Sequence, residues 1–376
     1  MRVLYFSPSY TPHDFRFLST LASTEHEIHY LRLERCSART DSRPVPPRVR
    51  VAEAVFPETV PSLGSILSLM PAFERVLDEV HPDLIHAGPI QSCAFITALA
   101  GFRPLVAMSW GSDLLVDADV DPLSRWATRY ALCRSDFLVT DSSEVSDLAA
   151  RYCALAEGAI VQFPWGVDLD VFKPGGTVDA TPGDWDDAFV LISIRAWEPR
   201  YGILTVLDGF RRALSDNPHL RLLLLGDGSM REQVQSYLAE HGLATFVCTP
   251  GFVPYSRLPD YFRSADAYVS CAFSDGSSVS LLEALASGLP VIVTDRPSNR
   301  EWVTPDENGW LVLYADVESV RAAFLRAAAL APSQREAIRA ANRAVAEARA
   351  NWSRNVAKLL DAYHTLETRT LARTSS

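Results

Sequence analysis

The strongest signal for the fold is residues 274–295, which read Ser-Asp-Gly-Ser-Ser-Val-Ser-Leu-Leu-Glu-Ala-Leu-Ala-Ser-Gly-Leu-Pro-Val-Ile-Val-Thr-Asp. The pattern predicts that a strand ends near Phe273 and that a short polar loop leads into a helix. Gly288 is expected to end this helix, and the apolar run Val291–Thr294 follows Pro290 as the next strand. A strand, a loop, a helix and a second strand in this order are typical of a parallel sheet.

The loop in this stretch carries residue types that suit a ligand with phosphate and hydroxyl groups. Gly276 lets the backbone approach a ligand closely. Ser277 and Ser278 stand where a helix begins, and the free amide groups of a helix start suit a phosphate. Asp275 and Glu283 bracket the loop, so that one carboxylate could bind hydroxyls of a sugar ring and the other those of a ribose. A serine-capped helix with a surface glutamate fits the same spacing equally well.

Outward from this stretch, short apolar runs alternate with helix-like segments. Most runs lack polar alternation, as expected for strands that are covered on both faces. The runs are Val3–Phe6, Ile28–Leu33, Val49–Phe56, Leu84–Ala87, Leu105–Ser109, Phe137–Thr140, Ala159–Phe163, Phe189–Ile194, Leu220–Leu225, Phe246–Cys248, Ala267–Cys271, Val291–Thr294 and Trp310–Leu313. The predicted fold class is therefore α/β, with doubly wound parallel sheets that bind ligands at the carboxyl ends of their strands.

The alternation restarts once, which predicts two Rossmann-like domains facing a central cleft. Residues 172–187 are rich in Gly, Pro and Asp and have no periodicity, so we interpret them as a linker. The domains are then residues 1–171 and 188–351. A helical pattern from about Arg343 to Leu366 predicts one long tail helix, and the part from about 352 to 376 is expected to pack back on the first domain.

Composition excludes several classes of protein. The chain has 376 residues, 35 of them basic and 46 acidic, and its net charge of −11 argues against non-specific binding to nucleic acid. The sequence has no signal-peptide pattern and no apolar run of about 18 residues, so we expect a cytoplasmic protein. The six cysteines form no C-x-x-C pair and have no zinc-ligand spacing, and they are expected to be reduced and mostly buried.

Residues 274–295 resemble the signature of the retaining family-4 glycosyltransferases of the GT-B fold, also called glycosyl transferases group 1. That signature is E-x7-E, followed by an Ala-rich helix and Gly-x-Pro-Val-Ile. Glu283 matches the second glutamate, and Asp275 stands in the place of the first. The resemblance implies that Glu283 binds the donor's ribose, that Asp275 binds its sugar, and that Ser278 and Val279 offer backbone amides to it.

The resemblance extends over most of the chain and is clearest in the second half. Arg195 fits the family's arginine after a strand, Arg200 occupies the position of its lysine, and Tyr201 is inserted before Gly202. These two cations would stabilise the charge that builds on a departing diphosphate. Gly226 begins a Gly-x-Gly loop, and the loop with Phe252 and Val253 resembles the one that reads the nucleobase edge. Surface charge for the arginines and core packing for Phe252 are the alternatives without the resemblance.

The first half matches more loosely and is expected to bind the acceptor. Trp110 replaces a histidine that often contacts the donor sugar, and Asp113 follows it as a turn or cap residue more readily than an acid. His13 could contact substrate, whereas Asp14 is expected to cap the next helix. The arginine-rich stretch Arg32–Arg50 would face an anionic acceptor or lipid headgroups, with a solvated loop as the alternative.

Taken together, the resemblance implies a glycosyltransferase of the hexosyltransferase type. It would move a sugar with retention from a nucleotide-sugar to a glycan, lipid-linked or small-molecule acceptor. No cofactor or metal is expected, because no D-x-D motif occurs at a strand end in a donor loop. Peripheral contact with the inner face of a membrane is compatible with these expectations. The alternatives are another GT-B reaction, such as epimerisation or phosphorolysis, and a non-catalytic homologue that binds sugar nucleotides.

Overall fold

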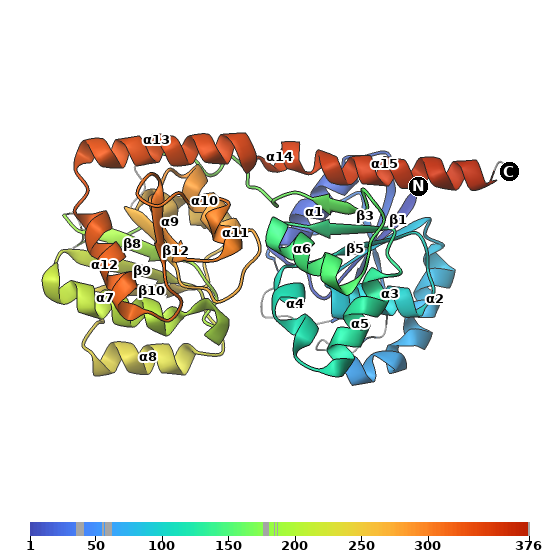
Figure 1. Ribbon diagram of the computed structural model, residues 1–376, viewed down its shortest axis with the longest axis horizontal. Coiled ribbons are helices and arrows are strands. Elements are labelled where there is room, and N and C mark those ends of the chain that lie inside the picture. The colour runs from blue at the N-terminus through green and yellow to red at the C-terminus, as the bar shows by residue number, and fades with distance from the viewer. Residues whose placement is uncertain are drawn as a thin grey trace. The chain divides into compact units, whose positions relative to one another are not determined.

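The computed structural model describes residues 1–34, 41–54, 56, 62–175, 180–183, 185 and 187–374, with side chains described up to residue 369. Its contacts divide the chain into two compact units. The first unit is Met1–Phe163 together with the chain from Val356 onward, and the second is Pro164–Asn355. Figure 1 shows that each unit contains a sheet with helices packed around it.

The first unit is built on a seven-stranded sheet in the order β3-β2-β1-β4-β5-β6-β7, and every neighbouring pair is parallel. The strands are β1 (Arg2–Ser7), β2 (Glu27–Arg32), β3 (Val49–Ala52), β4 (Leu84–Ala87), β5 (Leu105–Met108), β6 (Phe137–Thr140) and β7 (Ile160–Gln162). The order reverses between β1 and β4, which makes the sheet doubly wound. The α/β prediction is confirmed for this half, although β3 is shorter than the run Val49–Phe56.

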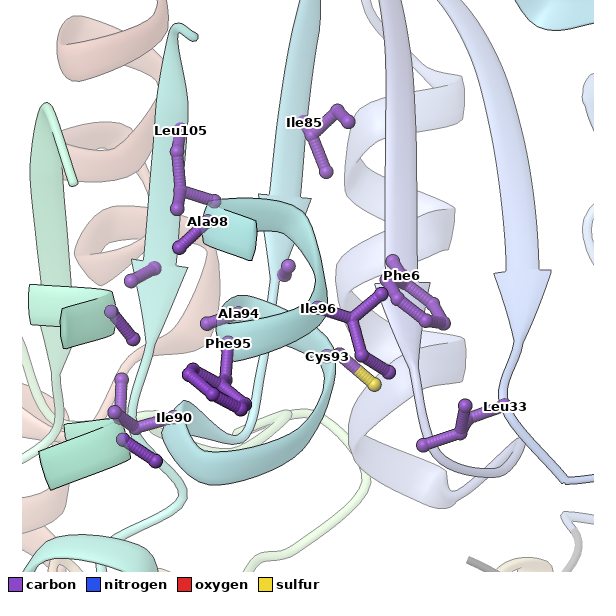
Figure 2. Packing of buried hydrophobic residues seen from close by; sticks show 14 of the residues in the cluster. Phe6, Leu33, Ile85, Ile90, Cys93, Ala94, Phe95, Ile96, Ala98 and Leu105 are labelled. Atoms are coloured by element: carbon purple, nitrogen blue, oxygen red, sulfur yellow. The ribbon is translucent and has the colours of Figure 1, made fainter. Parts of the chain in front are cut away.

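The helices of the first unit cover both faces of this sheet. They are α1 (Pro12–Ala22), η1 (Leu63–Leu69), α2 (Met70–Val80), η2 (Ile90–Ala94), α3 (Phe95–Leu99), α4 (Ser112–Leu115), η3 (Asp117–Asp119), α5 (Pro122–Leu132), α6 (Ser143–Tyr152) and α15 (Ala357–Thr374). Figure 2 shows Phe6, Ile85 and Leu105 on neighbouring strands, packed against η2 and α3. Strands and helices share this apolar layer, and each buried aliphatic or aromatic side chain contributes about 1.5–3 kcal/mol of transfer free energy.

The second unit holds a six-stranded parallel sheet in the order β10-β9-β8-β11-β12-β13. Its strands are β8 (Phe189–Ser193), β9 (Leu220–Leu225), β10 (Val247–Gly251), β11 (Ala267–Ser270), β12 (Val291–Thr294) and β13 (Gly309–Val312). Its helices are η4 (Pro199–Tyr201), α7 (Ile203–Asp216), α8 (Arg231–Glu240), η5 (Tyr255–Arg257), α9 (Leu258–Arg263), α10 (Val279–Ala286), α11 (Pro297–Arg300), α12 (Val317–Ala328), α13 (Pro332–Arg349) and α14 (Trp352–Asn355). The order reverses between β8 and β11, so this sheet is also doubly wound.

The division between the units falls between Phe163 and Pro164, earlier than the expected boundary at residue 171. Within the expected linker, residues 176–179, 184 and 186 lie outside the described residues. Phe172 and Trp185 from the same stretch are buried in the apolar core of the second unit. The described residues of this stretch therefore belong to the second unit, and two of its aromatic side chains anchor it there.

The prediction of one continuous tail helix from Arg343 to Leu366 is wrong. The chain forms α13, α14 and α15 instead, because residues 350 and 351 leave the helical path and the backbone here pairs with an earlier segment. Val167 donates its N–H to the carbonyl of Ala350 and accepts from the N–H of Trp352. This exchange of backbone hydrogen bonds ends α13 at a place that local periodicity does not mark. None of the described helices is both long and apolar enough to cross a membrane.

The final helix, α15, packs on the first unit through a buried polar contact. Tyr363 lies with its hydroxyl 2.7 Å from Nδ1 of His86 on β4, and both side chains are buried. Aromatic rings of Tyr5 and Phe17 meet the imidazole edge-on at 5.2 and 5.9 Å. The expected packing of the C-terminal helix on the first domain thus rests on β4 at the centre of the sheet.

Burial lowers the pKa of His86 to about 3. In the unfolded chain the pKa of this histidine is near 6.5. Below that pH the unfolded state binds a proton and the folded state does not, so acidification favours unfolding. We predict that this one group removes about 2 kcal/mol of stability between pH 6.5 and pH 5. Denaturant titrations of wild type and His86→Gln at several pH values measure it. The variant should lose less stability on acidification, and equal pH slopes in the two proteins would contradict the prediction.

The expectation that all cysteines are reduced is wrong for one pair. Cys133, which follows α5, forms a disulfide with Cys153, which follows α6. The two residues are 20 positions apart, and their Cα atoms are 5.6 Å apart because the intervening strand brings both helix ends to the same edge. Cys93, Cys248 and Cys271 are free, and Cys36 lies outside the described residues.

Candidate functional site

The predicted donor residues of the second unit gather beyond the carboxyl ends of neighbouring strands. Arg195 follows β8, Gly226 follows β9, and Asp275 and Gly276 lie between β11 and the start of α10. Because β8 and β11 are the strands between which the order reverses, the loops after them meet at the switch point of the sheet. The strand ends thus bring residues from 195 to 283 into one region.

Arg195 is the centre of this cluster. Its Nη1 donates hydrogen bonds to the hydroxyls of Ser278 at 2.7 Å and Ser280 at 3.0 Å. Its Nη2 lies 2.6 Å from Oδ2 of Asp275. Burial by itself would lower the pKa of Arg195, but the charge of Asp275 raises it above the usual value. Arg195 is therefore a fixed, fully charged cation beside the start of α10.

The inserted Tyr201 has a structural explanation. Its ring lies 4.2 Å from the Arg195 guanidinium, in a cation–π contact that supports the side chain from one face. Gly202 adopts a positive φ of 63°, and a Cβ at this position would collide with the carbonyl oxygen of Cys271. The carbonyl of Arg200 accepts from the N–H of Phe273 at 2.7 Å, and the Arg200 side chain is exposed. The turn thus leaves Arg200 directed to solvent at the same edge.

Sequence reasoning missed two members of the cluster, Ser280 and Tyr268. The hydroxyl of Tyr268 on β11 lies 2.7 Å from that of Ser280, and the Ser280 hydroxyl also lies 3.0 Å from that of Ser278. All three side chains are buried. The sequence did contain a signal for Ser280, because serines stand at both 278 and 280. Two residues at a helix start can both face the preceding strand.

The start of α10 holds the other predicted donor residues. Ser278 is the N-cap residue, and Val279 is the first residue of the helix. Gly276 and Ser277 are buried in the preceding loop, and the Ser298 hydroxyl donates to the carbonyl of Asp275 at 2.8 Å. Glu283 is only 3% exposed, which rules out the interpretation of a surface glutamate. A buried carboxylate one turn inside the helix is typical of a binding residue or a structural one.

The Gly-x-Gly loop is explained by close backbone packing. Gly226 has φ of 108°, and its missing Cβ leaves room for the carbonyl oxygen of Arg195. A Cβ on Gly228 would likewise collide with the carbonyl oxygen of Trp197. The backbone N–H of Trp197 donates to the backbone carbonyl of Asp227 at 3.0 Å. The two glycines therefore let this loop support the backbone that carries Arg195.

The loop after β10 presents an exposed aromatic side chain. Phe252 is 63% exposed, so the alternative of core packing is wrong, while Val253 is half-buried. The carbonyl of Gly251 accepts from the N–H of Gly226 at 2.8 Å, which ties this loop to the Gly-x-Gly loop. An exposed ring on a fixed loop offers a stacking surface at the edge of the site.

In the first unit, His13 and Trp110 lie together beyond the sheet. Their rings meet edge-on with centroids 5.5 Å apart. Asp113 is buried and its Oδ1 accepts from the Ser109 hydroxyl at 2.7 Å and from the Trp110 N–H at 3.0 Å, while burial raises its pKa to about 6. Thr11 is the N-cap residue of α1, and Asp14, three residues later, completes a capping box with it. Asp14 therefore takes part in the cap from inside the helix, and burial raises its pKa to about 6. Asp113 thus lies in the first turn of α4 and accepts hydrogen bonds from the residues before it, and His13 and Trp110 stay the candidate acceptor contacts.

The arginine-rich stretch is only partly described. Arg35 and Arg39 lie outside the described residues. Arg43 forms an ion pair with Asp41 at 2.6 Å and stacks on Phe15 at 3.8 Å, and Arg50 pairs with Glu27. Internal partners thus neutralise part of this charge, and contact with an anionic surface stays a prediction.

Solved structures share this fold across almost the whole chain. Sucrose-phosphate synthase from Thermosynechococcus elongatus superposes with a TM-score of 0.80 at 19% identity, covering 98% of this chain and 100% of that one. HepE of Anabaena, solved with UDP-glucose, gives a TM-score of 0.76 at 17% identity, with 97% and 100% coverage. The fold class is α/β of the GT-B type.

Family comparisons agree with the fold. Residues 181–344 match the family model of glycosyl transferases group 1, and residues 15–171 match that of glycosyltransferase family 4. A phosphatidyl-myo-inositol mannosyltransferase of Mycobacterium tuberculosis is 31% identical over 231 residues, 59% of this chain and 58% of the relative. The alpha-monoglucosyldiacylglycerol synthase of Streptococcus pneumoniae is 24% identical over 208 residues, 54% and 46% respectively. The matched region thus spans about half the length of these relatives. The chain belongs to the family-4 glycosyltransferases.

Proposed function

We propose that the protein transfers a hexosyl unit from a nucleotide-sugar to an acceptor hydroxyl, with retention and without a metal. The observation that carries this proposal is the largely buried Arg195, fixed by two serine hydroxyls and an aromatic face beside the start of a helix. Preorganised cations and helix-start amides stabilise the charge of a departing diphosphate. The family membership supplies the reaction class.

Each part of the donor has a candidate partner in the second unit. Arg195 and Arg200 would hold the diphosphate, together with the backbone amides of Ser278 and Val279. Glu283, buried within α10, would accept hydrogen bonds from the ribose hydroxyls. Phe252 and Val253 would lie along the nucleobase.

Retention follows from the way the family is expected to react. The acceptor would attack the anomeric carbon on the face from which the diphosphate leaves, through an oxocarbenium-like state. The leaving phosphate would take the proton of the acceptor hydroxyl, so no protein nucleophile would be needed. The cations of this site support that route because they stabilise the leaving group and perform no nucleophilic step.

The named relatives favour a lipid or glycan acceptor. Two of them are named for transfer to phosphatidyl-myo-inositol and for synthesis of a glucosyldiacylglycerol. By analogy, the first unit would bind a lipid-linked or sugar-containing acceptor near His13 and Trp110, and the protein would work in the cytoplasm at the inner face of a membrane.

A thermal-shift screen across UDP-, GDP-, ADP- and TDP-sugars tests the donor class. A ligand that binds only the folded protein at 100 times its Kd adds about 2.7 kcal/mol of stability. We expect one nucleotide series to raise Tm by several degrees, and the subsequent transfer to proceed unchanged in a chelator. NMR of the product reports the anomeric configuration. Release of a free epimer or sugar phosphate, with no acceptor product, would contradict transfer.

A further inference from the structure

The ion pair between Arg195 and Asp275 occupies the group that the proposed donor must reach. The Arg195 side chain is 11% exposed and that of Asp275 is 25% exposed. Nη1 donates to Ser278 and Ser280, Nη2 meets Asp275, Tyr201 covers one face, and Nε is buried without a hydrogen-bond partner. A diphosphate that approaches Nη2 therefore meets Asp275 and competes with it for this group.

Of these partners, Asp275 is the one that a diphosphate would displace. The serine hydroxyls are neutral and belong to the start of α10, so they can stay in place beside a bound anion. A carboxylate within about 4–6 Å of a phosphate repels it, and the same carboxylate competes for the same cation. The carboxylate and the diphosphate are thus alternative partners of Arg195.

We propose that Asp275 is the internal counter-ion of Arg195, which yields to the diphosphate of the donor and expels the nucleoside diphosphate product. The inference rests on the proposed function and assigns Asp275 as a positioning residue. In the free protein the pair is neutral and holds the guanidinium in place. After transfer, the return of the carboxylate to Arg195 competes with the product and speeds its release.

This role differs from a direct contact with the donor sugar, which the resemblance implies for this position. A sugar contact would matter for UDP-glucose and leave the binding of UDP unchanged. A counter-ion acts on the diphosphate itself, so it changes the affinity for UDP in the absence of any sugar. The two roles therefore separate in a measurement with the bare nucleotide.

Calorimetric titration of UDP, GDP and ADP into wild type and Asp275→Asn tests the proposal. Asparagine keeps the shape of the side chain and removes its charge, which leaves a largely buried cation without its counter-ion. We expect at least tenfold tighter binding of the nucleoside diphosphate that wild type binds best. In turnover, kcat and KM for the donor should both fall, because product release slows.

Two further variants keep the test interpretable. Asp275→Glu restores the charge and should bring the affinity back to within threefold of wild type. Asp295→Asn makes the same change in net charge at the same edge of the sheet, where Asp295 pairs with Arg300, and should also stay within threefold. The melting temperature of each variant without ligand shows that it is folded.

The outcomes distinguish this inference from the proposed function. Unchanged or weaker nucleotide binding by Asp275→Asn, with wild type binding normally, would overturn the counter-ion role alone. Equal tightening in Asp295→Asn would assign the effect to net charge and also overturn it. If neither wild type nor any variant bound a nucleoside diphosphate at millimolar concentration, the donor site itself would be wrong, and this inference would fall with it.

Discussion

Replacing Arg195 by alanine is expected to lower the rate of sugar transfer by on the order of 10²-fold or more. The guanidinium is held by Ser278, Ser280 and Tyr201 before any substrate arrives, so no reorganisation is needed when charge develops on the diphosphate. Initial rates with the donor from the thermal-shift screen give kcat and kcat/KM. Both should fall, because the interaction is strongest in the transition state.

The arginine variant needs a control for folding and for charge. Removing Arg195 leaves Asp275 half-buried without its partner, which by itself destabilises the chain. The double variant Arg195→Ala with Asp275→Asn removes both charges, and it should fold and stay slow. Arg300→Ala is the matched control, since Arg300 pairs with Asp295 at the same edge and is well exposed. Wild-type rates in Arg195→Ala, or an equal loss in Arg300→Ala, would count against the site.

Replacing Glu283 by alanine is expected to cost on the order of 10²-fold in kcat/KM, through binding of the ribose. The side chain is buried in α10, and alanine cannot replace a carboxylate that accepts hydrogen bonds from two ribose hydroxyls. The expected signature is a loss in the binding of the nucleotide itself, and calorimetry with the nucleoside diphosphate measures it directly.

A comparison of ribo- and 2′-deoxyribonucleotides separates a ribose contact from a structural role. Wild type should prefer the ribonucleoside diphosphate, and Glu283→Ala should bind both forms with nearly equal, weak affinity. Glu318→Ala is a suitable control because Glu318 is an exposed glutamate on α12 that pairs with Arg212. If Glu283→Ala kept the full preference for ribose, the carboxylate would have to act elsewhere.

Much of the second unit could be predicted from residues that are close in sequence. Strands such as Leu220–Leu225 and Val291–Thr294 are marked by apolar runs because both faces of each strand are buried. The position of Arg195 after one such run and of Asp275 after another was enough to place both at the same edge, since parallel strands share their carboxyl ends. The partners of Arg195 could not be predicted in this way, because Ser280 and Tyr268 join the cluster through packing of α10 on β11.

Three features depended on contacts between separate elements of the fold. The break between α13 and α15 follows from backbone hydrogen bonds between Val167 and residues 350–352, and no local pattern encodes it. The disulfide between Cys133 and Cys153 requires two helix ends to meet at one edge of a sheet. The docking of α15 depends on the contact of Tyr363 with His86, 277 residues away.

The order of apolar and polar residues was sufficient for the fold class, for both parallel sheets and for the loops that carry the candidate site. Burial on two faces and strand direction leave a periodic signature in the sequence itself. Which groups meet within those loops was decided by folding, because contacts such as that of Arg195 with Asp275 arise from the packing of separate elements and have no periodic signature. The pairing of that cation with its carboxylate, and with it the proposed release of product, could be seen only once the chain was folded.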